Sequence, residues 1–254
     1  MCLIVFKYQP CDTHKLILLA NRDEFYERDT HEAAYWPDLP TIFGGIDGVA
    51  GGSWLSVDDN GRMAAITNIR KPPFADSSKK SRGDLIKSFL SSSLSAKQYL
   101  GKLKETDHQY NLFNILLFDE TGLWHYSNDS GLIEQVSSGV HGLCNASLNT
   151  PWPKLINTRR AFEKQINQPS LTTEALLDIM QSETRPDDNE LPDTGVGLEF
   201  ERLLSSAFIT SENYGTRCTT LLTIDQKNRV DFKEVTYNSN GQAEKTIHEL
   251  IKSH

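Results

Sequence analysis

The chain has 254 residues, and 34 acidic residues against 26 basic ones give it a formal net charge of -8 at pH 7. Such a balance offers no large basic face for phosphates, so nucleic acid is not an expected partner. This length suits one hydrophobic core and no stretch reads as a long linker, so we expect a single domain over residues 1–254.

The start of the chain does not resemble a signal peptide, because the apolar run Leu3 to Phe6 is short and ends at Lys7. No window approaches the roughly eighteen uninterrupted apolar residues that a membrane helix needs. We therefore expect a cytoplasmic protein without a membrane span. The cysteines show neither C-x-x-C nor metal-ligand spacing, which predicts free thiols and no metal site. They are Cys2, Cys11, Cys144 and Cys218.

The first half of the chain predicts two strand pairs followed by two helices. The strand-like runs are Cys2 to Tyr8, Lys15 to Ala20, Ser53 to Val57 and Arg62 to Asn68. The turn of the second pair lies at Asp59-Asn60-Gly61, a strong hairpin signal. Apolar residues at helical spacing then predict helices over Asp84 to Leu90 and Ala96 to Leu103.

The second half begins with four short alternating or apolar runs that predict a second sheet region. These runs are Asn111 to Asp119, Gly122 to Ser127, Leu132 to Val136 and His141 to Asn145. Helices are expected from Thr150-Pro151 through Phe162 and over Thr173 to Gln181. An exposed loop over Arg185 to Gly197 and a short helix near Phe200 to Leu204 follow.

A last hairpin is expected over Arg217 to Ile224 and Val230 to Tyr237, turning at Gln226-Lys227-Asn228. Strands thus come in consecutive hairpins and helices in consecutive pairs, which favours antiparallel sheets over a parallel βαβ sheet. The predicted fold class is α+β, a four-layer αββα sandwich of two antiparallel sheets covered by helices.

Cys2 is the residue that offers the most chemistry. Initiator methionine is normally removed before a small residue, and its removal would leave Cys2 with both a thiol and a free α-amine. Such an amine is a competent general base near neutral pH and a thiol is readily activated by it, so nucleophile and base would share one residue. The alternative is that Cys2 is an apolar residue opening a buried strand.

Acyl transfer also needs donors for the developing oxyanion, and Asn68 and Asn145 each end a predicted strand. Their alternative role is to bond their own turns. Arg22, Asp23 and Glu24 follow an apolar strand directly, where the arginine would steady a thiolate and a carboxylate would hold an ammonium group. A surface ion network is the alternative reading of that cluster.

Arg217 starts a predicted strand, and period-two alternation aims it opposite to Cys218. The alternation therefore allows only one of these two residues to face the site.

With these residues in view, the chain resembles the NRDE, or transport and Golgi organisation protein 2-like, family, named for Asn21-Arg22-Asp23-Glu24. The likeness runs over nearly the whole length. Its blocks are MCLIVF at 1–6, LLANRDEF at 18–25, GGSWLSV at 51–57, ITNIRKP at 66–72, RGDLI at 82–86, YNLFNILLFD at 110–119, HGLCNASLNTPWPK at 141–154 and YGTRCTTLLTID at 214–225. The family implies intracellular haem trafficking and links to lipid or acyl-CoA metabolism.

A more distant resemblance connects the chain to the cysteine acylases of the choloylglycine hydrolase and penicillin V acylase family. It implies the N-terminal-nucleophile hydrolase fold, with Cys2 as nucleophile, Asn68 and Asn145 as the two oxyanion asparagines and Arg217 as a looser match. An ungapped alignment sets Asn21 and Glu24 on the acylases' arginine and aspartate. A one-residue shift sets Arg22 and Asp23 there instead, with reversed facing.

Two functions follow. The first is binding and transfer of haem, for which an axial ligand such as Cys2, His31 or His141 is expected. The second is hydrolysis of a non-peptide amide or acyl thioester by Cys2, for which no cofactor is required. In both cases the partner is a small hydrophobic ligand, either haem or an acyl compound. A membrane-traffic scaffold ranks last, because the sequence shows no amphipathic anchor or lipidation signal.

Overall fold

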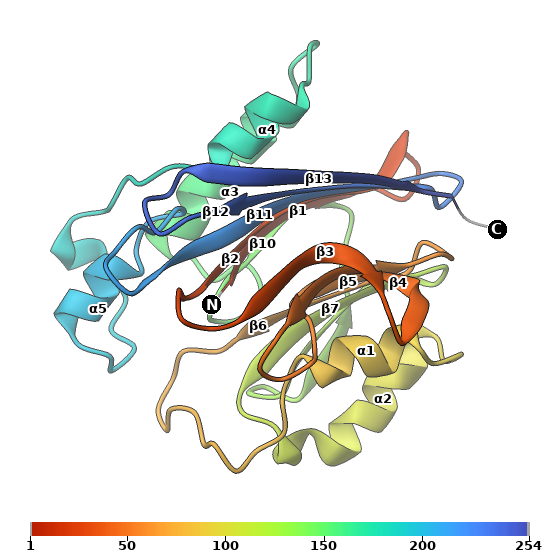
Figure 1. The fold of residues 1–254 in the computed structure, drawn as a ribbon, viewed down its shortest axis with the longest axis horizontal. Helices are drawn as coiled ribbons and strands as arrows, with labels where there is room; N and C mark the ends of the chain where they lie inside the picture. Colours follow the sequence, from red (N-terminus) through yellow and green to blue (C-terminus); the bar gives the residue numbers. More distant parts are fainter. Residues whose placement is uncertain (1, 253–254) are drawn as a thin grey trace.

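The computed structural model describes residues 2–252, and for Cys2 the position of its backbone in the first strand. Two antiparallel sheets form the centre of the molecule (Figure 1). The first has the strand order β10-β1-β2-β11-β12-β13. Its strands are β1 Cys2–Tyr8, β2 His14–Phe25, β10 Gly139–Leu143, β11 Tyr214–Asp225, β12 Val230–Tyr237 and β13 Ala243–Ile251.

The second sheet follows chain order from β3 to β9, so each strand pairs with its sequence neighbour. Its strands are β3 Thr30–Trp36, β4 Leu39–Asp47, β5 Leu55–Asp58, β6 Met63–Asn68, β7 Phe113–Asp119, β8 Gly122–Ser127 and β9 Leu132–Gln135. Gly61 turns the β5–β6 hairpin with a φ of 76°, a conformation that glycine adopts without strain.

Helices cover the outer face of each sheet. Helices α1 Asp84–Leu90 and α2 Ala96–Thr106 pack on the second sheet, while α3 Pro153–Ile166 and α4 Thr173–Ile179 pack on the first (Figure 1). Ser95 and Gln98 form a capping box that starts α2. The predicted αββα sandwich is therefore confirmed. A short helix, α5 Leu198–Leu203, lies beyond these layers.

Alternation along β1 shows why this strand reads as a continuous apolar run. Ile4 and Phe6 belong to the core between the two sheets, whereas Leu3 and Val5 pack in the core beneath α3 and α4. Both faces of a central strand are then buried, which requires apolar side chains at successive positions. No helix among residues 2–252 is long and apolar enough to cross a membrane.

Three strands were not predicted: β3, β4 and β13. Of these, β3 and β13 are each one edge of their sheets, and β4 lies between β3 and β5. The side chains of β13 are mostly exposed, so its sequence carries no apolar signal. Helix α3 begins at Pro153 instead of Thr150, because Trp152 rather than Thr150 is its N-cap.

Two expected boundaries near the candidate site are wrong. Arg22, Asp23 and Glu24 do not follow the second strand but lie inside it, since β2 pairs with β1 as far as Arg22 and with β11 as far as Phe25. Asn145 does not end its strand, because β10 stops at Leu143 where pairing with β1 ends at Ile4.

Candidate functional site

The candidate nucleophile lies at the first position of β1. Its backbone stands directly opposite Arg22 in the antiparallel register of β1 and β2. The side chain of Cys2 and the whole of Met1 lie outside the described residues. The register nevertheless places position 2 beside the motif from which the sequence predicts its helpers.

Arg22 points between the two sheets, where its side chain is buried. Its guanidinium donates to Thr30 Oγ1 at 3.0 Å and to Asp47 Oδ2 at 3.2 Å, and lies 4.3 Å from the centre of the Trp54 ring. Burial acts to raise the pKa of Asp47, but Arg28, the Ala50 N–H and Arg22 outweigh it and hold that pKa below its usual value. Arg22 is therefore fixed in place by an ionised partner.

Asn21 and Asp23 lie on the opposite face of β2. The Asn21 amide donates to the carbonyls of Met180 and Ala207, both at 2.8 Å, and so ties β2 to the helix layer. Of these two neighbours, Arg22 therefore faces the inside of the sandwich and Asn21 faces the helix layer.

Asp23 is fully buried and accepts a hydrogen bond from Thr216 Oγ1 at 2.7 Å. Burial raises the pKa of its carboxyl, against the opposing charges of Lys154 and Arg22. Glu24 is less buried and accepts from the N–H of Phe25 at 2.9 Å. Of the two carboxylates, Asp23 is the more shielded from water, so an opposite charge would interact with it more strongly than with Glu24.

Arg217 lies at a β-bulge in β11, because Thr216 pairs with Asp23 and Cys218 with Arg22. The extra residue breaks strict alternation there, so the period-two prediction for Arg217 and Cys218 does not apply at this position. The Arg217 guanidinium donates to the carbonyls of Phe25, Tyr26 and Arg28 at 2.9, 3.3 and 3.1 Å. It holds the turn after β2, and it does not line either pocket described below.

Asn68 and Asn145 come together although they are far apart in the sequence. The Asn145 amide Nδ2 donates to the Asn68 carbonyl at 3.0 Å and to Asn68 Oδ1 at 3.1 Å. These contacts use the two hydrogens of the Asn145 amide and turn the Nδ2 of Asn68 the other way. Asn145 is buried behind Asn68 and orients it, while Asn68 lines the adjoining pockets.

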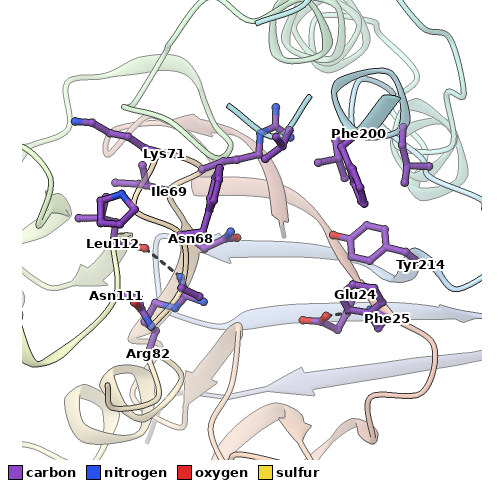
Figure 2. Close-up of a pocket in the computed structure, with 17 residues that line it drawn as sticks. Glu24, Phe25, Asn68, Ile69, Lys71, Arg82, Asn111, Leu112, Phe200 and Tyr214 are labelled. Carbon is purple, nitrogen blue, oxygen red and sulfur yellow. Dashed lines mark hydrogen bonds between the residues drawn. The ribbon is translucent and has the colours of Figure 1, made fainter. Parts of the chain in front are cut away.

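Two pockets of about 570 Å³ each meet at Asn68 and share Glu24, Ala75, Arg82 and Asn111. The polar pocket is lined by Arg22, Asp23, Arg28, Asp47, Trp54 and Lys80, among others. The apolar pocket is lined by Phe25, Ile69, Phe74, Leu112, Val196, Phe200, Leu203, Leu204 and Tyr214, among others. Figure 2 shows Asn68 inside this pocket, between the side chains of Leu112 and Tyr214.

A buried ion pair anchors one wall of the apolar pocket. Arg70, just after β6, donates to Glu201 of α5 at 2.7 Å and to Thr194 Oγ1 at 2.9 Å, and lies over the Trp152 ring. The pair links the segment that carries Asn68 to the helix that carries Phe200. Arg70 Nη1 and Asn145 Oδ1 are the buried side-chain polar atoms without a hydrogen-bond partner among the described residues, and such atoms often mark functional sites.

The two histidines proposed as haem ligands do not line either pocket. His31 is exposed beside Asp29, and His141 contacts the Ser137 carbonyl and the Asn149 amide. The described lining of the apolar pocket contains no histidine, cysteine or methionine, and Tyr214 is its residue with an oxygen suited to haem iron.

Several residues that shape the site were not predicted from the sequence. Arg70 lies in the family-like block at 66–72, which was a usable signal, whereas Glu201 and Phe200 lie in a short helix with no chemical motif. Trp54 lies in the family-like block at 51–57, whereas Asp47 lies in β4, a strand that was not predicted. Their roles depend on which segments the sheet topology brings together.

The sequence matches the family described as Transport and Golgi organisation 2 over residues 1–239. A Bos taurus Transport and Golgi organization protein 2 homolog is 34% identical, and a Mus musculus homolog 33%, each over 92% of both chains. Among solved structures, a Caenorhabditis elegans N-acylethanolamine-hydrolyzing acid amidase ortholog matches with a TM-score of 0.52 and 8% identity, covering 87% of this chain and 92% of that one. The structural match confirms the N-terminal-nucleophile hydrolase fold.

Proposed function

The chain belongs to the Transport and Golgi organisation 2 family, and from this premise we propose that it is a hydrolase in which Cys2 cleaves an acyl amide or thioester. The observation that carries the proposal is the hydrogen-bonded pair of Asn145 and Asn68. It leaves one amide donor, on Asn68, at the junction of an apolar and a polar pocket. A donor held in this way suits a developing oxyanion.

The chemistry starts once Met1 has been removed. The α-amine of Cys2 takes the thiol proton, and the thiolate attacks the acyl carbonyl carbon to form a tetrahedral oxyanion beside Asn68. Collapse breaks the bond to the leaving amine or thiol, which takes the proton from the α-ammonium group. Water then attacks the acyl-enzyme thioester, regenerating the Cys2 thiol and releasing a carboxylic acid.

Neighbouring residues of β2 supply the charges. Arg22 stands opposite position 2 in the register, so its guanidinium is placed to steady the thiolate. Asp23 is the next residue along β2, and in this proposal its buried carboxylate holds the ammonium form of the α-amine. In this account Asn145 and Arg217 are positioning residues, the first for Asn68 and the second for the turn after β2.

The apolar pocket is assigned to the acyl chain of the substrate. Phe200→Ser should raise KM for a long-chain acyl substrate about tenfold with little change in kcat, because it removes apolar contact present in both ground and transition states. Leu250→Ser is the matched control, since Leu250 is also exposed but lies on β13, outside the pocket. Equal KM values for the two variants would place the acyl chain elsewhere.

Haem binding is the second candidate, and the size and apolar lining of the same pocket favour it as a cargo site. If the pocket carries haem, titration should give one saturable absorption band that survives Cys2→Ala and is displaced or shifted in Tyr214→Phe. A band unchanged in Tyr214→Phe would remove this pocket as the ligating site. The absence of a saturable band would exclude haem binding and leave hydrolysis as the remaining proposed function.

A further inference from the structure

A chain of buried polar side chains crosses the core between the sheets and ends beside Asn145. His125 of β8 contacts Glu134 Oε1 of β9 through Nδ1 at 2.8 Å and Asn114 Oδ1 of β7 through Nε2 at 3.2 Å. The Asn114 amide continues to Thr67 Oγ1 at 3.2 Å and to the Ala146 carbonyl at 2.8 Å. Thr67 Oγ1 donates to the Cys144 carbonyl at 2.8 Å.

This network fixes both neighbours of Asn145. The carbonyls of Cys144 and Ala146 are held from the second sheet, while the Asn145 carbonyl accepts from the N–H of Arg70 at 2.8 Å. Three successive backbone groups are therefore tied down around the side chain that orients Asn68. Supporting hydrogen bonds of this kind hold the side chains of a functional site in place to within about 0.5 Å.

The direction of the hydrogen bonds can be followed from one end to the other. Thr67 gives its proton to Cys144, so it accepts from Asn114, whose second amide hydrogen goes to Ala146. Asn114 therefore presents its oxygen to His125, and that contact needs a hydrogen on Nε2.

The other ring nitrogen faces a carboxylate, and a second hydrogen is needed there, on either His125 Nδ1 or Glu134. The complete network thus contains one more proton than a neutral imidazole beside an ionised carboxylate. When that proton is lost, either Asn114 or Glu134 faces a ring nitrogen without a hydrogen between them. Two facing acceptors repel, so one contact must open.

His125 and Asn114 are buried, whereas the Glu134 side chain is 39% exposed. Burial lowers the pKa of His125 from its ordinary value of 6.5, and Glu134 acts in the opposite direction. Glu134 is the charged group in contact with the ring. The charge of Glu134 also acts on His141 of β10, on which Arg159 of α3 acts in the opposite direction.

We infer that His125 is a positioning residue for the Asn145–Asn68 pair, acting through Asn114, and that a proton shared with Glu134 completes its network. The expected effect on catalysis rests on the proposed function, whereas the coupling between His125 and the Asn145–Asn68 pair does not. Because the pKa of folded His125 lies below 6.5, the network is complete at acid pH and opens as pH rises through that pKa.

The coupling can be measured without any reaction. In protein labelled with nitrogen-15, the His125 ring and the side-chain amides of Asn114 and Asn145 should titrate with one common midpoint. Glu134→Gln should abolish the amide shifts, because a glutamine amide can donate to the neutral ring and complete the network at every pH. Glu244→Gln, an exposed change on β13, should leave them as in the wild type. Asn145 signals that do not move with His125 would overturn the inference.

Acyl transfer supplies the second readout. The ratio of wild-type to Glu134→Gln acylation rates cancels the titration of Cys2, which both proteins share. The ratio should be near one at acid pH and fall to about one tenth at neutral pH, the cost of one opened buried contact. A ratio independent of pH would contradict the role of His125. If neither protein is acylated, the proposed hydrolase fails while the amide titration still decides the coupling.

Discussion

Cys2→Ser is expected to lower the rate of covalent acylation by an acyl-transfer probe by at least about a thousandfold, because loss of a catalytic nucleophile leaves only binding and oxyanion stabilisation. At its free pKa a hydroxyl is a far weaker nucleophile than a thiol, part of which is already thiolate at neutral pH. A variant that retains Met1 should be equally inactive, since its Cys2 nitrogen is an amide.

Cys11→Ser is the control for the first prediction, because Cys11 is an exposed cysteine that forms no disulfide and has no part in the proposed site. It should acylate at the wild-type rate. Labelling that disappears in Cys11→Ser and persists in Cys2→Ser would assign the reactivity to an accidental surface thiol.

Asn68→Ala is expected to reduce kcat by on the order of 10²–10³, the usual cost of removing one oxyanion donor, while changing KM little. The Asn68 side chain is oriented by Asn145 and lines both pockets, so its loss removes a transition-state contact without emptying the acyl site. The test is steady-state kinetics on a chromogenic acyl thioester and on the matching amide.

Asn240→Ala serves as the matched control for Asn68, since Asn240 is an exposed asparagine in the turn between β12 and β13. Its kinetics should be unchanged. If Asn68→Ala raises KM and leaves kcat intact, Asn68 binds substrate and another group stabilises the oxyanion.

Much of the fold was predictable because its central elements carry strong local signals. Helix α1 was predicted at its observed bounds, since Leu85, Ile86, Phe89 and Leu90 are all buried at helical spacing. Strand β8 was predicted as well, bounded by a glycine and a polar turn. Edge strand β13 escaped, because mostly exposed side chains leave no apolar run to detect.

The site was predictable only in part, because its geometry depends on long-range pairing. The sequence singled out Arg22 and Asn68 by residue type, and the structure brings both to one pocket. The sequence did not predict that Arg217 lies at a bulge and binds backbone carbonyls, because the bulge is set by the pairing of β2 with β11. The link from His125 to Asn145 likewise joins three strands, β8, β7 and β6, to the loop after β10.

The most direct test of the account is the intact mass of the purified protein before and after incubation with a panel of acyl-transfer electrophiles. We predict a starting mass lacking the initiator methionine, then a gain of one acyl group that peptide mapping places on Cys2. A retained methionine, or a free but unreactive Cys2, would contradict the hydrolase and leave the pocket to a binding role.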